Sequence, residues 1–146
     1  VGAETITEIK LDLTGLKAKG DAAGDAIGLG AGGAAYLIQL VDATHGVIVK
    51  TELTCLELPA TGGTLTKDFD LRTDTDGAVA YDGPVGNVTL LAAAGDFAVG
   101  TTKQSIAAHA TTNNHYLYFT EGDTSAAEST FTAGKFIIRL TGIKPF

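Results

Sequence analysis

The feature that most constrains this chain is the alternation of apolar and polar side chains near both of its ends. Within residues 129–143 the two kinds take turns: Phe136, Ile138 and Leu140 alternate with Lys135, Arg139 and Thr141. Residues 5–13 repeat the pattern, with Ile9, Leu11 and Leu13 on one side and charged residues on the other. Because successive side chains of a strand point to opposite faces, this period of two predicts a half-buried strand in each segment.

Further strands are predicted between these two, separated by turn residues. They lie at residues 34–42, 46–58, 64–72 and 115–123, with short extended pieces at 78–87. The first two are joined by a compact turn that ends in Gly46, which predicts a hairpin. Residues 88–104 fit either a helical turn or two successive strands. A loose likeness between residues 34–54 and 114–141 is interpreted as two hairpins of one sandwich.

The composition favours an all-β fold. The 146 residues include 19 glycines and no Met or Trp, and a hydrophobic content of 45% with 18% charged residues argues against a disordered chain. Roughly seven to nine short strands with turns between them predict a single antiparallel β-sandwich of jelly-roll-like form. A chain of this length fits one domain, here residues 1–146.

The charge and the apolar pattern exclude two classes of partner. The formal net charge is -7 and no run of Lys or Arg occurs, which argues against direct binding of nucleic acid. No apolar run approaches the roughly 20 residues of a membrane helix, and the N-terminus lacks a signal-peptide pattern. We therefore expect neither a nucleic-acid partner nor a membrane partner.

Residues 14–33 are rich in glycine and alanine and show little periodicity, which predicts a long, mobile loop or arm. This arm contains Gly28-x-Gly30-x-x-Gly33, the spacing of the dinucleotide-binding fingerprint. The fingerprint needs a buried strand before its first glycine and a helix after its last. No such strand precedes Gly28, although Glu52 lies near the position of the expected acidic residue. We interpret the glycines as part of the flexible arm, with a nucleotide-binding enzyme as an alternative.

Several carboxylates surround Gly77: Asp68, Asp70, Asp74, Asp76 and Asp82. Closely spaced oxygen ligands beside a glycine turn suit Ca²⁺. The EF-hand pattern is incomplete, because Arg72 takes an acidic-ligand position and no glutamate closes the loop. Asp and Thr before glycine are also ordinary turn residues, so we interpret the region as turns and assign no metal.

The sequence assigns no catalytic residue and no cofactor. The histidines His45, His109 and His115 lack a zinc-site spacing, and no serine lies in a nucleophile elbow. The lone cysteine, Cys55, is interpreted as a small buried hydrophobe on a strand face. We therefore expect a protein without enzymatic activity.

Residues 115–119 combine a strand pattern with aromatic side chains. Tyr116, Tyr118 and Phe119 fit either the core of a sandwich or a sugar-stacking platform on an exposed sheet face. Core packing is the commoner use of aromatic residues in an alternating strand, and it is the interpretation that we favour.

Six segments follow one another along most of the chain: LDLTGL, GGAAYLIQL, TELTCLELPA, LLAAAGDFAVG, YLYF and FTAGKFIIRLTG. In style and order they resemble the small Gly/Ala/Thr-rich β-sandwich proteins of marine tailed bacteriophage virions. The resemblance covers residues 9 to 143 and includes no catalytic or ligand motif.

The resemblance implies a capsid decoration or cement protein, made in the host cytoplasm and bound to the outer surface of the virion. Its partner would be the major capsid protein lattice, and it would act as a homo-oligomer. We expect the arm at 14–33, or the extended N-terminus, to order against a neighbouring subunit or the capsid shell. The alternative from another class is a carbohydrate- or receptor-binding module of a phage fibre or tail.

Overall fold

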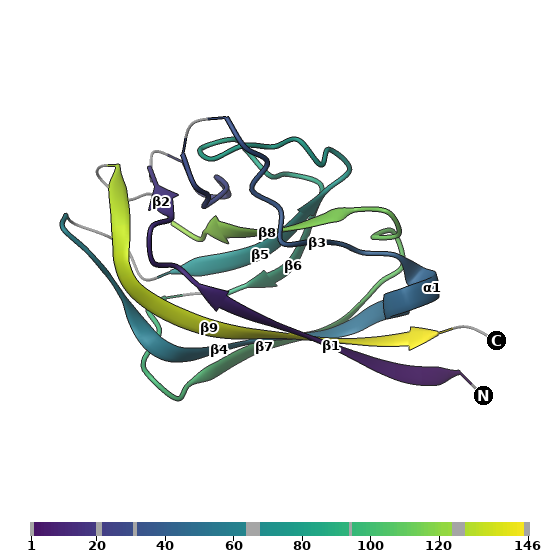
Figure 1. Ribbon diagram of the computed structural model, residues 1–146. Coiled ribbons are helices and arrows are strands. Elements are labelled where there is room, and N and C mark those ends of the chain that lie inside the picture. The colour runs from purple at the N-terminus through teal and green to yellow at the C-terminus, as the bar shows by residue number, and fades with distance from the viewer. Residues whose placement is uncertain are drawn as a thin grey trace.

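The computed structural model describes residues 2–19, 22–30, 32–63, 68–93, 95–123 and 128–144. Within these ranges the chain forms nine strands and one helix of four residues, so the predicted all-β class is confirmed. The strands make two antiparallel sheets that face each other across a core (Figure 1).

The first sheet has five strands and the second has four. The first has the order β1-β9-β4-β7, with β1 (Ala3–Asp12), β9 (Ser129–Lys144), β4 (Val47–Thr61) and β7 (Thr102–His109). The short β2 (Lys17–Ala18) also pairs with β9. The second has the order β3-β8-β5-β6, with β3 (Ile38–Gln39), β8 (Tyr116–Glu121), β5 (Phe69–Asp74) and β6 (Val88–Ala92).

The pairing follows a simple rule along the chain. Leaving β2 aside, the first strand pairs with the last (β1 with β9), the second with the second last (β3 with β8), and so on through β4 with β7 and β5 with β6. Successive pairs alternate between the two sheets. The chain is therefore one long antiparallel ribbon rolled into a sandwich, which is the jelly-roll arrangement that the sequence predicts.

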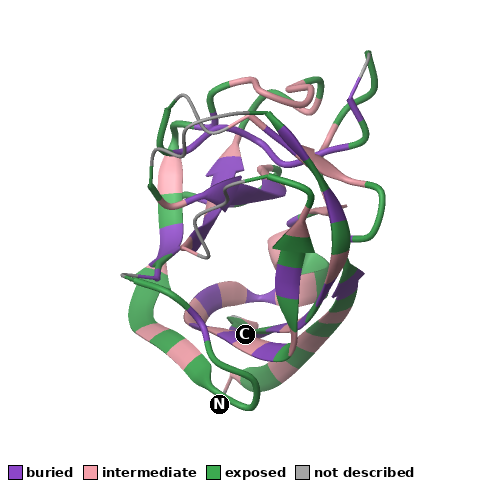
Figure 2. Ribbon diagram, turned by 90° about the vertical axis from the view of Figure 1, so that its left-hand side faces the viewer, coloured by how far each residue is buried: buried purple, intermediate pink, exposed green. Residues whose placement is uncertain are grey.

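The two alternating segments at the ends of the chain pair with each other. β1 pairs with β9 from Ala3 opposite Lys144 to Asp12 opposite Lys135. Phe136, Ile138 and Leu140 of β9 are buried, whereas Lys135 and Arg139 are exposed. Figure 2 shows buried and exposed residues alternating along the long strands. The apolar face of this sheet thus packs on the second sheet, as the period of two predicts.

Aromatic rings from both sheets fill the centre of the sandwich. The ring of Phe69 on β5 stacks on Phe119 of β8 with centroids 4.9 Å apart, and it meets Phe136 of β9 edge-on at 5.6 Å. Phe97, from the segment before β7, meets Phe136 edge-on at 5.3 Å. Cys55 is fully buried in the same core, which confirms its interpretation as a buried hydrophobe.

The predicted hairpin between residues 34–42 and 46–58 is wrong. β3 belongs to the second sheet and β4 to the first, and the helix α1 (Asp42–His45) carries the chain from one to the other. Gly46 ends α1 with φ +73°, and a Cβ there would lie 2.7 Å from the backbone of Ile143. The chain does turn at residues 42–46, but the turn connects two sheets and not two strands of one hairpin.

The likeness between residues 34–54 and 114–141 also has a different meaning from the one we expected. β8 and β9 cross between the sheets just as β3 and β4 do, so neither copy is a hairpin. The copies instead pair with each other, β3 with β8 and β4 with β9. In the ambiguous region 88–104 the two-strand alternative is correct, because β6 is followed by β7.

The arm does not extend away from the molecule over residues 24–28, all of which are buried. Gly24 and Ile27 donate backbone hydrogen bonds to Glu121 and Phe119 on the edge of β8. On its other side the arm bonds to the loop after β5, where Ala26 donates to the carbonyl of Gly83 at 2.9 Å. The prediction of a free, mobile arm is therefore wrong for this part of it.

The arm and the loop after β5 create a second, smaller core on the outer face of the second sheet. Its buried members are Ala26 of the arm, Val85 of the loop and Tyr118 of β8. The Tyr118 hydroxyl donates to the carbonyl of Asp76 at 2.6 Å. β8 is consequently covered on both faces, whereas the outer face of the first sheet carries exposed charged residues.

Candidate functional site

The glycine fingerprint lies in a context that does not match a dinucleotide site. Gly28 is buried, and its backbone exchanges two hydrogen bonds with Lys17, at 2.7 and 3.2 Å. The described residues between Gly33 and β3 are not helical. Because the Gly28 N–H is already bonded and no helix N-terminus follows, the glycines do not form a phosphate-binding turn.

The carboxylates of the Asp68–Asp82 region serve turns and strand ends. Asp74 accepts hydrogen bonds from the backbone of Asp76 and Gly86 and from the side chain of Asn87. Asp76 accepts from the backbone of Ala78 at 2.8 Å. The described residues contain no group of three or more His, Cys, Asp or Glu side chains that could hold a metal.

The two aspartates at the start of β5 have different partners. Asp70 is buried, accepts from the backbone N–H of Ala93 at 3.0 Å and pairs with Arg72 at 2.9 Å. Asp68 accepts from the backbone N–H of Gly95 at 3.1 Å. Burial raises the pKa of the Asp68 carboxyl above its usual value, and the neighbouring Asp70 charge raises it further.

The three histidines come from different segments, and none of them belongs to a described group of side chains that could hold a metal. His45 lies in α1, where its Nδ1 is 3.0 Å from the backbone N of Val41. His115 precedes β8, with Nδ1 3.0 Å from the hydroxyl of Thr73, and His109 ends β7. Burial raises the pKa of the Cys55 thiol, which keeps it in its less nucleophilic protonated form.

The structure decides how the aromatic strand is used. Phe119 belongs to the main core, and Tyr118 is fully buried in the second core. Tyr116 is half-buried and meets the ring of Tyr36 edge-on with centroids 4.9 Å apart. The core interpretation is confirmed for Tyr118 and Phe119, and Tyr36 is the exposed aromatic ring beside them.

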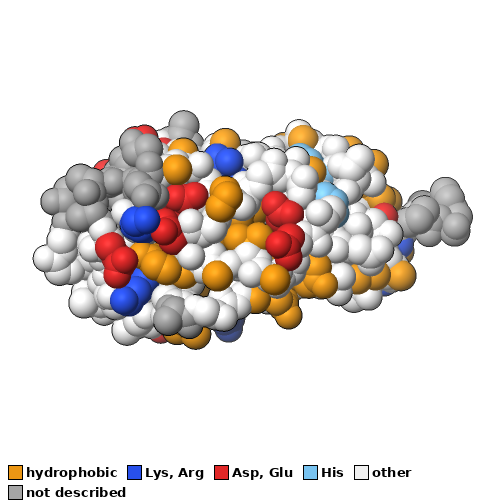
Figure 3. All heavy atoms as spheres, turned by 90° about the horizontal axis from the view of Figure 1, so that it is seen from above, with side chains coloured by type: hydrophobic (Ala, Val, Ile, Leu, Met, Phe, Trp, Pro, Cys, Tyr) orange, Lys and Arg blue, Asp and Glu red, His pale blue; other side chains and the backbone are white. Residues whose placement is uncertain are grey.

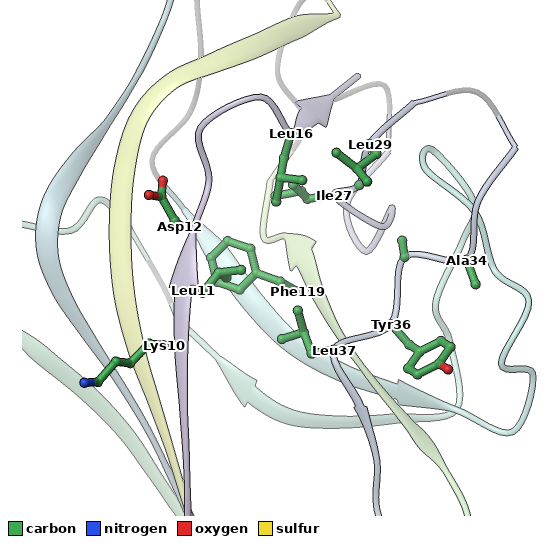
Figure 4. Close-up of a pocket in the computed structure, with 12 residues that line it drawn as sticks. Lys10, Leu11, Asp12, Leu16, Ile27, Leu29, Ala34, Tyr36, Leu37 and Phe119 are labelled. Carbon is green, nitrogen blue, oxygen red and sulfur yellow. The ribbon is translucent and has the colours of Figure 1, made fainter.

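The described residues form an open cleft of about 350 Å³ beside the arm, between β1 and the segment that leads into β3. Its apolar walls come from β1, the arm, the segment before β3 and β8: Leu11, Leu16, Ile27, Leu29, Leu37 and Phe119. Leu11, Leu37 and Phe119 lie together in Figure 4, with the three arm residues gathered above them. We call this concavity the arm cleft.

The polar residues of the lining do not form a reactive set. Lys10 and Asp12 extend away from the arm cleft, toward the outer face of the first sheet (Figure 4). Tyr36 lies at the margin of the cleft, packed on Tyr116. Within the part of the chain that the structure describes, the arm cleft therefore offers apolar surface and no acid–base pair.

The mouth of the arm cleft is apolar as well. Leu29 is 79% exposed and Tyr36 is 43% exposed. Seen from above, this side of the molecule carries apolar side chains close to acidic groups (Figure 3). Surface with these properties can bury an apolar side chain or segment of a partner.

Sequence reasoning did not find the arm cleft. Leu16, Ile27 and Leu29 are isolated apolar residues in a segment without periodicity, so no pattern marked them as the walls of one site. Leu11 and Phe119 are distant in the sequence and meet only because β1 and β8 lie in facing sheets. The available signal was weak: large apolar side chains in an otherwise small-residue segment.

No helix among the described residues has the length and apolar character needed to span a membrane. Comparison of the chain with protein-family models, curated proteins and solved structures gave no match.

Proposed function

We propose that this chain is a non-enzymatic structural protein of a phage virion, which binds the outer surface of the major capsid lattice and stabilises it. The observation that carries the proposal is the arm cleft, an apolar concavity with no acid–base pair facing it. Such a surface contributes binding energy by burial and performs no chemistry. Decoration of a shell needs an adhesive surface of this kind on a rigid support.

The fold supports the proposal by analogy. Jelly rolls occur in viral capsid and lectin domains. The fold is therefore compatible with a capsid role or a sugar-binding role, and it assigns neither by itself. The phage resemblance adds to it, because the segments LDLTGL and GGAAYLIQL contribute Leu11, Leu16 and Leu37 to the arm cleft. The net charge of -7 favours solubility at a high copy number.

The arm enters this proposal in a changed form. Residues 24–28 are packed against β8 and cannot reach a neighbour without leaving that position. Leu29 remains on the surface at the mouth of the cleft. We therefore assign the capsid contact to the arm cleft and to Leu29. Burial of the Leu29 side chain in that contact would contribute about 1.5–3 kcal/mol to the free energy of binding.

The first test is the copy number of the chain in purified particles of the phage that encodes it. Quantitative mass spectrometry against the major capsid protein should give one copy per capsid subunit or per capsomer. A handful of copies per particle would place the chain in the tail or a fibre. Absence from purified particles would overturn the proposal.

The second test examines the contact surface. Leu29→Asp should abolish co-sedimentation of the purified chain with undecorated capsids, because it places a charge where apolar burial is needed. Ile6→Asp is the matched control, since Ile6 is an exposed apolar residue on the outer face of the first sheet. Equal binding by both variants would show that the arm cleft is not the contact.

A carbohydrate-binding role is the second candidate, and one observation favours it. Tyr36 presents an exposed ring at the margin of the arm cleft, supported edge-on by Tyr116. A ring held in this way can stack on a sugar face. Calorimetric titration with glycans recovered from the host surface should then show binding that Tyr36→Ala removes.

A further inference from the structure

Four strands end the two sheets, and they differ in how well their free sides are protected. β3 has two residues and β6 has five, too short to template a long strand. β1 has ten residues but carries four charged side chains, Glu4, Glu8, Lys10 and Asp12. β7, with eight residues, is the long edge strand without such a row of charges.

The free side of β7 presents unpaired backbone groups. The carbonyl of Thr101 accepts a hydrogen bond from the N–H of Cys55 at 3.0 Å, so the backbone of Thr101 faces β4. In an antiparallel ladder such residues alternate with residues whose N–H and C=O point the other way. Thr102, Gln104 and Ile106 therefore direct their backbone groups away from β4, and no bond from another described residue reaches them.

The side chains of β7 leave that edge open. Lys103 is turned back over the ring of Phe97, with its Nζ 4.3 Å from the centroid, and also bonds to the carbonyl of Gly95. Ile106 is 75% exposed. No proline or acidic residue occurs in the strand. Residues 102–106 therefore lack a proline, an acidic residue and a bulge, and their one lysine is turned away, so this stretch of the edge is open to pairing.

The regular part of this edge is self-complementary. The pairing of β7 with β4 is in step from Thr102 to Ile106, and the register shifts beyond that point. If two copies meet antiparallel with Gln104 on a two-fold axis, Thr102 of each copy faces Ile106 of the other and Lys103 faces Ser105. That register gives about six backbone hydrogen bonds and opposes no like charges.

We propose that β7 pairs with β7 of a second copy of this chain, with the pairing centred on Gln104. The β1-β9-β4-β7 sheets of the two copies then form one continuous sheet. The occupant is a second copy because the edge matches itself in both side-chain pairing and charge. The whole chain is acidic, with a formal net charge of -7, whereas β7 brings no carboxylate to the contact. The proposal goes beyond the capsid role and does not depend on it.

The first experiment measures the mass of the whole purified chain by sedimentation equilibrium. The expected mass is twice 14.9 kDa. Gln104→Pro removes an N–H that points to solvent in the single chain, a position where an edge strand tolerates proline. This variant should raise the dimer dissociation constant at least tenfold. A wild-type monomer at the highest soluble concentration, or an unaffected variant, would overturn the proposal.

Two charged substitutions keep the test valid even if the proline variant fails to fold. Ile106→Lys adds a charge at the contact, and Ile6→Lys adds the same charge at the opposite edge of the same sheet, where Ile6 is 58% exposed. Ile106→Lys should give a folded monomer, and Ile6→Lys should remain a dimer. Equal behaviour of the two variants would contradict the assignment to β7.

A third variant locates the two-fold axis. Gln104→Cys places one exposed thiol in a chain whose native cysteine, Cys55, is buried. In the proposed register the two thiols face each other at the separation that a disulfide spans. Mild oxidation should give a disulfide-linked dimer, and Ile6→Cys should stay monomeric on a non-reducing gel. A linked product from Ile6→Cys alone would refute the register.

Discussion

The outer face of the β1-β9-β4-β7 sheet is open to solvent, whereas the outer face of the second sheet lies beneath the arm and the loop after β5. On the open face the side chains form exposed ion pairs, such as Glu8 with Arg139 at 3.3 Å and Glu57 with Lys135 at 2.7 Å. On the covered face Tyr118 is fully buried. The outer face of one sheet is therefore covered by water and that of the other by a second apolar layer of the protein.

The comparison explains the composition of the arm. A Cβ at Gly24 would lie 2.6 Å from Nη1 of Arg72, and a Cβ at Gly28 would lie 2.9 Å from Cβ of Ala35. These approaches leave no space for side chains. The glycines at positions 24 and 28 therefore serve close packing over the covered face, whereas a Cβ at Gly33 meets nothing within 4 Å.

The largest predicted difference between the faces concerns Tyr118. Tyr118→Ala should lower the free energy of unfolding by about 3–5 kcal/mol, because it removes a fully buried ring. Ile6→Ala on the open face should change it by about 0.5 kcal/mol or less, as is typical of surface positions. Urea denaturation of both variants measures the difference. Similar losses would mean that the second core is not a stabilising layer.

A smaller effect is expected from glycine positions in the arm. Gly28→Val should destabilise the fold by about 1–3 kcal/mol, because the new side chain overlaps Ala35. Gly33 supplies the control, since a Cβ there meets nothing within 4 Å. Thermal unfolding should show a lower midpoint for Gly28→Val alone. A flexible arm, by contrast, would accept both substitutions equally well.

These expectations also indicate what the sequence could predict. The burial of Phe136, Ile138 and Leu140 follows from local alternation, because the period of two reports which face of a strand is apolar. The hairpin before β4 was wrong because a turn signal reports a change of direction and not the sheet that the next strand joins. Pairing partners of the jelly roll are distant in sequence, as β1 and β9 illustrate.

The candidate site was less predictable than the fold. Glycine at positions 24 and 28 is compatible with a mobile arm and with a tightly packed one, and only the neighbours Arg72 and Ala35 decide between them. The walls of the arm cleft likewise come from segments that no periodic pattern connects. The positions of these wall residues follow from the folded chain and could not be read from residue type.

The covered face should also give the protein a sensitivity to high pH. Burial raises the pKa of Tyr118 from 10.0 to about 12. The folded state therefore keeps this phenol neutral, and its contribution to stability is complete below pH 10 and is lost as the pH rises through about 12. Denaturation measured across this interval should show a steeper fall for the wild type than for Tyr118→Phe. Parallel curves would show that Tyr118 is not buried.

The smallest effect is expected on the open face. Arg139 pairs with Glu8 while both side chains remain well exposed, so water and salt screen their attraction. Arg139→Ala should lower the free energy of unfolding by less than about 1 kcal/mol, and the loss should shrink further in high salt. A double-mutant cycle with Glu8→Ala isolates the pair from other effects of the two substitutions. A coupling well above that value would mean that this face is shielded from solvent, for instance by another copy or a partner. In that case the contrast between the two faces would hold for the isolated chain and disappear in the assembly.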